Sequence, residues 1–235
     1  MTTALVHDYL LVMRGAERTF AAMADAWPDA PVFTTLYDEA GTERRFSGHD
    51  VQTSFLQRTG ARQEGFRKLL PLFPAAVARL PVRDYDVVVS SSSAFAHGVH
   101  PGPDAVHVCY CHSPFRYVWH ERDTAIAEMP AALRPVGGAV LAAIRRWDLK
   151  AAGRVTSYVA NSQITRARIQ EFYGRDAPVI HPPVEIERFD GLATEPEDWL
   201  LIVCALMRHK RVDRALEAAR AAGKRVKVVG EGPER

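Results

Sequence analysis

Short apolar runs separated by longer amphipathic stretches form the main pattern of this chain. The run at residues 86–90 carries three successive valines, which is typical of a parallel strand buried on both faces. The run at residues 106–110 is soon followed by Ser113-Pro114, where a strand must end because proline has no N–H donor. Strands are predicted at residues 4–6, 32–37, 51–56, 86–90, 106–110, 157–160, 199–206 and 226–229.

The stretches between these runs repeat apolar residues at helical spacing. The first predicted helix starts near Gly15 and stops before Pro28. Residues 67–80 mix basic and apolar side chains around Pro71 and Pro74, which indicates a broken amphipathic helix. Further helices are predicted at residues 136–151, 164–172 and 212–219. Because strands alternate with helices, the pattern favours an α/β fold with a parallel sheet.

The alternation of predicted strands and helices is interrupted once, by an acidic, loop-like segment of residues 185–198, which we interpret as a linker. Residues 1–184 then form a first domain, and residues 199–235 form a single strand–helix–strand unit. A two-stranded sheet with one helix buries little apolar surface. This unit therefore either docks on the first domain or begins a larger domain, and we favour the second interpretation.

Composition narrows the class of protein. The hydrophobic content of 47% and the charged content of 25% are those of a soluble globular chain. A net charge of +2 argues against nucleic acid as the main partner. The N-terminus lacks the basic region of a signal peptide, and no apolar stretch is long enough to cross a bilayer. An odd count of 3 cysteines suggests free thiols, so a cytoplasmic protein is expected.

The stretch from His107 to Trp119 carries the most informative chemistry. It places His112 at the carboxyl end of a strand, where open α/β sheets bind ligands, and Arg116 follows in the same loop. An imidazole and a guanidinium close together suit a phosphate and a polar sugar. The alternative is a structural histidine at a capped strand end.

The motifs, taken in their order along the chain, resemble the family 4 retaining glycosyltransferases, particularly their bacterial mannosyltransferase-like branch. The segments that carry the resemblance are His7-Asp8-Tyr9-Leu10, Gly15-Ala16-Glu17, residues 85–92, residues 111–119, Ala160-Asn161-Ser162, Thr165-Arg166, Phe172-Tyr173-Gly174, Pro182-Pro183-Val184, Lys210-Arg211-Val212-Asp213 and residues 229–235. The resemblance implies a GT-B fold. In that fold, two Rossmann-like domains face a cleft, the first holding mainly the acceptor and the second mainly the nucleotide-sugar donor, without a metal.

The resemblance also implies roles for residues of the first domain. His112 would contact the transferred sugar or its phosphate near the reacting carbon and is the catalytic candidate. Arg116, Asn161 and Arg166 would bind the acceptor, and the alternative for Arg116 is that it orders its loop. Gly15 would let the donor approach backbone N–H groups at a helix N-terminus, and the alternative is a simple tight turn.

On the donor side, the resemblance implies binding by Lys210, Arg211, Gly230 and Gly232. The Lys210 ammonium would offset the charge that develops on the leaving diphosphate. The family usually carries an arginine five residues before this lysine, where this chain has Ala205. The family's later Glu-x7-Glu pair is also absent, so we expect a chain truncated in its second domain that transfers little sugar alone.

Other classes of site fit the sequence less well. Cys109, Cys111 and His112 lack a second cysteine pair at zinc spacing, so buried thiols are favoured over a metal site. The first strand is not followed by Gly-x-Gly-x-x-Gly, which argues against a nicotinamide dehydrogenase. Residues 67–80, with Arg79 and Arg83, suit either peripheral contact with an anionic membrane or a packed helix at the edge of a cleft.

Together these observations predict a hexosyltransferase without a cofactor or metal. It would move mannose from GDP-mannose, with retention, to a cell-surface glycan or its lipid-linked precursor at the inner face of the plasma membrane. The alternative is a non-catalytic glycan- or lipid-binding module without a donor domain.

Overall fold

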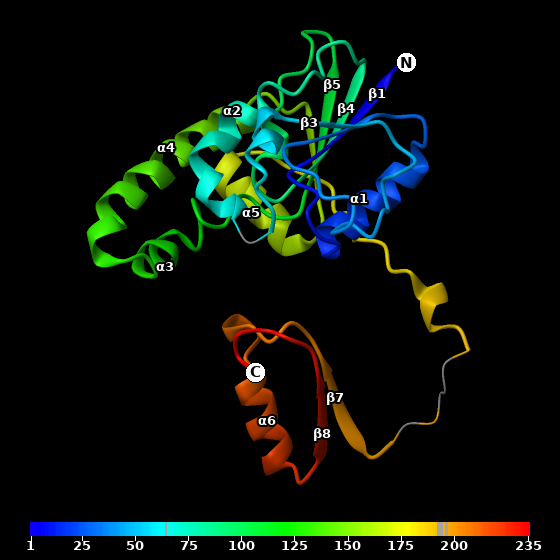
Figure 1. Cartoon of the computed structure of the whole chain (residues 1–235), viewed down its shortest axis with the longest axis vertical. Coiled ribbons are helices and arrows are strands. Elements are labelled where there is room, and N and C mark those ends of the chain that lie inside the picture. Colours follow the sequence, from blue (N-terminus) through cyan, green and yellow to red (C-terminus); the bar gives the residue numbers. More distant parts are fainter. Residues whose placement is uncertain (64, 192–194, 196) are drawn as a thin grey trace. The chain divides into compact units, whose positions relative to one another are not determined.

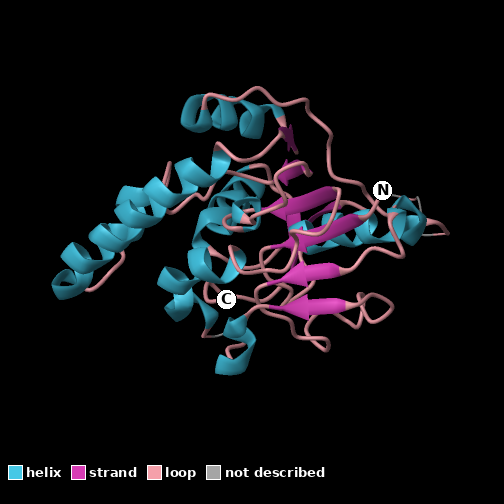
Figure 2. Cartoon of the chain, turned by 90° about the horizontal axis from the view of Figure 1, so that it is seen from above, coloured by secondary structure: helices cyan, strands magenta, loops and turns pink. Residues whose placement is uncertain are grey.

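The computed structural model describes residues 1–63, 65–191, 195 and 197–235. The chain divides into two compact units, Met1–Val184 and Glu185–Arg235. The first unit contains a six-stranded sheet in the order β3-β2-β1-β4-β5-β6 (Figures 1 and 2). Its strands are β1 (Thr3–His7), β2 (Val32–Thr34), β3 (Val51–Thr53), β4 (Val87–Ser92), β5 (Val106–Cys111) and β6 (Ser157–Ala160).

All neighbouring strands of this sheet are parallel, and Figure 2 draws them as arrows that run the same way. The order is that of a doubly wound sheet, and its direction of winding reverses between β1 and β4. Ligands bind such sheets at this reversal, outside the carboxyl ends of the strands. The predicted fold class, α/β with a Rossmann-like parallel sheet, is confirmed.

The α-helices of the first unit are α1 (Gly15–Ala26), α2 (Phe73–Val77), α3 (Arg122–Ala127), α4 (Arg134–Ala152) and α5 (Gln163–Tyr173). Short 3₁₀ helices are η1 (Phe55–Thr59), η2 (Phe66–Leu72), η3 (Ala96–Gly98) and η4 (Ala131–Leu133). The predicted helices at 16–27, 136–151 and 164–172 are therefore confirmed. Helix α3 was not predicted from the sequence, and none of its residues is buried.

Both faces of the sheet are buried, as the apolar runs predict. On β1, Ala4 and Val6 belong to the cluster that includes residues of α2 and α4, whereas Leu5 packs with Phe20 of α1. Because side chains alternate along a strand, odd-numbered residues of β1 face α1 and even-numbered ones face the other cluster. This alternation decides which side chains meet at the carboxyl edge of the sheet.

Two predicted strands are shorter in the structure. β3 ends at Thr53, and the predicted continuation to residue 56 is wrong because Ser54 caps η1: its hydroxyl accepts a hydrogen bond from the Leu56 N–H at 3.1 Å. β2 ends at Thr34, and only an isolated bridge joins Leu10 to Tyr37.

The predicted broken helix over 67–80 forms η2 followed by α2, with Pro71 inside η2. Phe66, Phe73 and Val77 are buried in the core, so this segment packs against the sheet. Contact of its basic residues with a membrane stays a prediction. Among the described residues, no helix is both long and apolar enough to span a bilayer.

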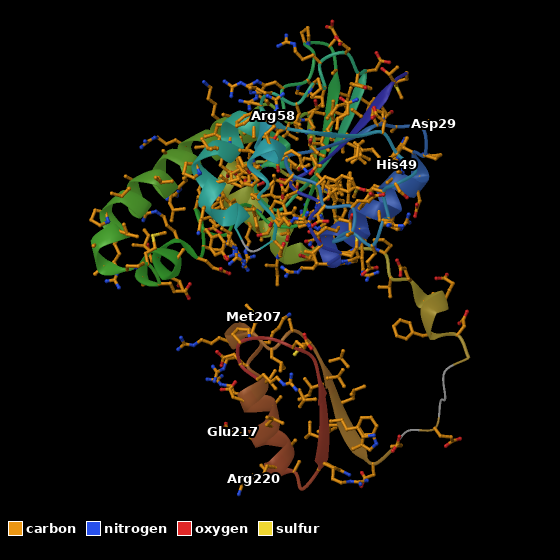
Figure 3. The ribbon with its side chains drawn as sticks, viewed as in Figure 1. Asp29, His49, Arg58, Met207, Glu217 and Arg220 are labelled. Atoms are coloured by element: carbon orange, nitrogen blue, oxygen red, sulfur yellow. The ribbon has the colours of Figure 1, made fainter. Side chains whose placement is uncertain are left out.

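The second unit contains η5 (Ile186–Phe189), β7 (Trp199–Val203), η6 (Arg208–Lys210), α6 (Val212–Ala221) and β8 (Arg225–Val229). β7 and β8 form a parallel pair, and β7 stops three residues before the predicted end at Leu206. Glu217 and Arg220 extend from α6, and Met207 lies just before η6 (Figure 3). Residues 192–194 and 196 of the predicted linker lie outside the described residues.

Candidate functional site

The carboxyl ends of β1, β4 and β5 bring three polar side chains together beside the reversal in strand order. The register pairs His7 with Ser91, and Ser91 with Tyr110, two residues before His112. Side chains two residues apart lie on the same face, so His7, Ser91 and His112 share the face that α1 covers. The predicted catalytic residue, His112, therefore lies in a cluster to which β1 and β4 contribute as well as β5.

Hydrogen bonds connect this cluster in a line. The Ser91 hydroxyl lies 3.1 Å from His7 Nδ1 and 2.8 Å from His112 Nε2. Beyond His7, its Nε2 lies 4.0 Å from a carboxylate oxygen of Glu17 in the first turn of α1. We call Glu17, His7, Ser91 and His112 the polar chain. His7, Ser91 and Glu17 are buried and His112 is half-buried.

The protonation of the polar chain follows from burial and from its neighbours. Burial and the nearby His7 lower the pKa of His112 to about 4, so its imidazole is neutral at pH 7. Burial opposes ionisation of Glu17, but the His7 ring and the backbone N–H groups of Glu17 and Arg14 together outweigh it and hold the pKa of this carboxyl below its usual value. Glu17 is therefore an anion that favours an N–H on His7 Nε2.

A direction of hydrogen bonding follows when His7 is neutral. With its proton on Nε2, facing Glu17, His7 accepts from the Ser91 hydroxyl at Nδ1, and Ser91 then accepts from Nε2–H of His112. The remaining ring nitrogen of His112, Nδ1, is then an acceptor. The polar chain thus presents an unprotonated nitrogen that can accept a hydrogen bond from a ligand hydroxyl.

Asp8, the residue after β1, shapes the loop that follows β4. Its carboxylate accepts hydrogen bonds from the backbone N–H groups of Ser93, Phe95 and Ala96 at 2.6, 2.8 and 2.6 Å. These contacts satisfy backbone N–H groups in the segment that leads into η3, and the Asp8 side chain is buried. Asp8 therefore fixes backbone rather than facing a ligand.

Trp119 anchors the loop that follows β5. Its indole N–H donates to the buried carboxylate of Asp148 on α4 at 2.7 Å, and its ring stacks on Phe172 with centroids 4.7 Å apart. Asp148 also accepts from the hydroxyl of Tyr173 at 2.8 Å. The loop between His112 and Trp119 is thus fixed at both ends, which limits the positions open to Arg116.

A pocket of about 320 Å³ opens beside this loop. It is lined by residues that closely follow members of the polar chain, namely Tyr9, Ser93 and Ser113. Residues of η2 and of the loop after β5 complete it, with aromatic rings and the side chains of Arg67 and Arg116. Its volume lies at the lower end of the range for small-molecule sites.

The structure shows where the other predicted residues of the first unit lie. Arg116 borders the pocket, whereas Arg166 is an exposed residue of α5 that pairs with Asp176 at 2.9 Å. Asn161 follows β6, and its side-chain oxygen accepts from the Ser162 hydroxyl at 3.0 Å. Ser162 caps α5, as the sequence predicts, by accepting from the Thr165 N–H. Acceptor binding by Asn161 and Arg166 stays a prediction.

Gly15 is the first residue of α1, and a Cβ added there would meet no atom within 4 Å. The backbone at this helix N-terminus is therefore open to approach, as the predicted donor contact requires.

Of the predicted donor residues of the second unit, Lys210 and Arg211 immediately precede α6, and Gly230 and Gly232 follow β8. Lys210 lies in η6 and is exposed, while Arg211 adopts left-handed φ of 49° and its guanidinium pairs with Asp213. Cβ atoms on Gly230 and Gly232 would come within 1.8 and 2.2 Å of the carbonyl oxygens of Cys204 and Leu206. Close backbone approach thus explains both glycines, and their contact with a donor stays a prediction.

The described part of the chain contains no group of three or more metal-ligating side chains. Cys109 and Cys111 are buried in one apolar cluster, as their alternation on a strand predicts. Burial raises the pKa of the Cys109 thiol to about 12, which disfavours the thiolate that metal binding needs.

Sequence reasoning missed several residues of this site. His7, Asp8 and Ser91 were identified only as parts of segments that carry the family resemblance. Glu17 was likewise named only within the segment Gly15-Ala16-Glu17. For Asp148 a usable signal existed, because this acid lies on the same helical face as Ile144 and Ala151, which are apolar and buried.

A doubly wound sheet with a polar cluster at its reversal defines a ligand-binding α/β protein. The model of Glycosyltransferase Family 4 matches residues 13–188, and the chain belongs to this family. No curated protein matches the chain. Among solved structures, Anabaena HepE in complex with UDP matches at a TM-score of 0.55 and 14% identity, covering 100% of this chain and 70% of that one. At this identity the match supports the fold.

Proposed function

We propose that this chain takes part in the transfer of a hexose from a nucleotide sugar, with retention at the anomeric carbon and without a metal ion. The donor we propose is GDP-mannose, and the acceptor is a cell-surface glycan or its lipid-linked precursor at the inner face of the plasma membrane. Family membership supports glycosyl transfer in general. The UDP in the HepE structure supports a nucleoside diphosphate as the carrier of the sugar.

The observation that carries the proposal is the placement of His112. It lies at the carboxyl edge of the sheet, neutral, with Nε2 bound to Ser91 and with no hydrogen bond of Nδ1 to any described residue, so Nδ1 is open to a ligand. A neutral imidazole can orient a sugar hydroxyl without adding charge beside the reacting carbon. In this proposal Lys210 of the second unit offsets charge on the leaving diphosphate, and Gly15 leaves room for it at the N-terminus of α1.

The test is a transfer assay with a panel of nucleotide sugars that includes GDP-mannose, UDP-glucose and UDP-galactose. Because little transfer is expected of this chain alone, the assay uses the full-length protein, for which we expect turnover with the GDP sugar and a loss of at least ~100-fold in kcat/KM for His112→Ala, as for removal of one stabilising contact in other enzymes. His120→Ala is the matched control, because His120 lies in the following turn and contacts Glu121 at 3.9 Å. Turnover by His112→Ala equal to that of the control would contradict the role of His112.

A binding module without catalysis is the second candidate, favoured by Ala205 at the position where the family usually has an arginine. It predicts that glycans bind equally well to the parent protein and to His112→Ala, with no nucleotide sugar consumed by either. The same two proteins therefore separate both candidates.

A further inference from the structure

The pocket of about 320 Å³ beside the loop after β5 combines two kinds of wall. One wall is aromatic: Tyr9 lies 4.6 Å from Phe66, and Phe95 lies 5.0 Å from Phe115, between ring centroids. Phe66, Phe95 and Phe115 are buried and belong to the core of the first unit. Such rings are held rigidly and offer flat apolar surface to the C–H face of a sugar.

The other wall is cationic. Arg67 of η2 is exposed, and no ion pair or hydrogen bond of its side chain is found within the described residues. Arg116 enters from the loop after β5, with its guanidinium carbon 4.6 Å from the centre of the Tyr117 ring and its Nη2 2.7 Å from the Tyr117 hydroxyl. Glu121 lies 3.6 Å from Arg116 Nε and compensates part of its charge.

These two cations come from segments about fifty residues apart in sequence, yet they line one pocket. Arg116 is oriented by Tyr117, and its loop is anchored by Trp119 on Asp148. No carboxylate side chain of the described residues lines this pocket, so the charge of Arg67 is open to a ligand there. A guanidinium pair of this kind matches the oxygens of a phosphate or a carboxylate.

We propose that this pocket is the subsite for an acceptor sugar that carries an anionic oxygen group, with its ring on the aromatic wall and its anion between Arg67 and Arg116. Two sources supply this chemistry, a phosphate at the anomeric carbon of a sugar and the carboxylate of a uronic acid. The inference rests on the proposed function, since it names the chemical class of the acceptor. It adds Arg67 to the residues proposed to bind the acceptor, and it assigns the anionic group of the acceptor as the partner of Arg116.

The test measures binding by calorimetry to the whole protein, with three probes of similar size: glucose 1-phosphate, methyl glucuronide and methyl glucoside. We expect at least one anionic probe to bind about tenfold or more tightly than methyl glucoside, because a hydrogen bond to a charged group contributes about 1.5 kcal/mol or more. The stronger of the two anionic probes identifies the source of the anion. Equal affinity for all three probes would overturn the proposal.

Variants then locate the anion. Arg67→Gln and Arg116→Gln should each weaken the preferred anionic probe about tenfold and leave methyl glucoside unchanged. Lys68→Gln is the matched control, because Lys68 is the exposed neighbour of Arg67 and does not line the pocket. An equal loss in Lys68→Gln and Arg67→Gln would show general attraction to a basic surface and contradict the subsite.

Two further measurements separate this inference from the proposed function. Inorganic phosphate alone should bind more weakly than glucose 1-phosphate, because it cannot use the aromatic wall. Equal binding would show that the aromatic wall takes no sugar. Hydrolysis of the nucleotide sugar by the full-length protein without acceptor should persist in Lys68→Gln, because Lys68 does not line the pocket. No hydrolysis by the parent protein refutes the proposed function, whereas charge-independent binding of the glycosides refutes the subsite.

Discussion

Replacement of Ser91 by alanine tests the polar chain directly. The Ser91 hydroxyl is the bridge between the rings of His7 and His112, at 3.1 and 2.8 Å. The change removes one oxygen atom and leaves a ring nitrogen on each histidine without its partner. Because an unsatisfied buried polar group costs about 1–3 kcal/mol, we expect the free energy of unfolding to fall by about 2 kcal/mol.

The effect on transfer should exceed what lost stability explains. Without Ser91, nothing favours the proton on Nε2 of His112, so the ring is free to change tautomer and orientation. We expect kcat/KM to fall about 10- to 100-fold, which corresponds to about 1.4–2.7 kcal/mol. The ¹⁵N chemical shifts of the His112 ring should move from a single Nε2–H tautomer toward a mixture.

Ser90→Ala is an unusually close control for this experiment. The Ser90 hydroxyl lies 2.8 Å from Nε2 of His107, so the variant also removes a buried serine–histidine contact of that length. His107 lies outside the polar chain, and Ser90 points to the opposite face of β4 from Ser91. Ser90→Ala should lose similar stability but keep kcat/KM and the His112 spectrum. Equal losses of kcat/KM in both variants, or an unchanged His112 tautomer in Ser91→Ala, would show that the polar chain does not orient His112.

Three further predictions follow from the packing. Burial lowers the pKa of His107 to about 3 and that of His112 to about 4. Between those values and pH 6.5, the unfolded chain therefore binds more protons than the folded one. The free energy of unfolding should be at its full value above pH 6.5 and should fall by several kcal/mol toward pH 4. A urea midpoint that is constant from pH 7 to pH 4.5 would contradict this. Asp148→Ala should lower the free energy of unfolding by about 2–4 kcal/mol, because Trp119 and Tyr173 lose a buried acceptor. The control is Asp176→Ala on the surface, which should leave the melting temperature unchanged. Gly230→Ala should lower the free energy of unfolding of the second unit by about 1–3 kcal/mol, because the added Cβ would overlap the Cys204 carbonyl. Gly15→Ala places its Cβ in open space and should fold normally. Thermal unfolding of both variants checks this difference.

The sequence determined the elements of this fold and the position of its central histidine. Triple valine at 87–89 indicated a strand buried on both faces, and Ser113-Pro114 placed His112 just beyond a strand end. Both inferences depend on local physics, namely side-chain alternation and the missing donor of proline. The strand end at 53 was misjudged because the capping of η1 by Ser54 competes with extension of β3.

The tertiary structure decided which side chains meet. Register between β1 and β4 pairs His7 with Ser91, and register between β4 and β5 carries the line on to His112. A shift by one residue would turn Ser91 to the other face, toward the cap that Asp8 makes, so no local pattern could have identified the polar chain. Arg67 and Arg116 likewise share a pocket only because η2 packs against the carboxyl edge of the sheet. The local sequence determines the secondary structure and the side-chain chemistry at each position, whereas contacts between distant segments determine which side chains lie together in a site.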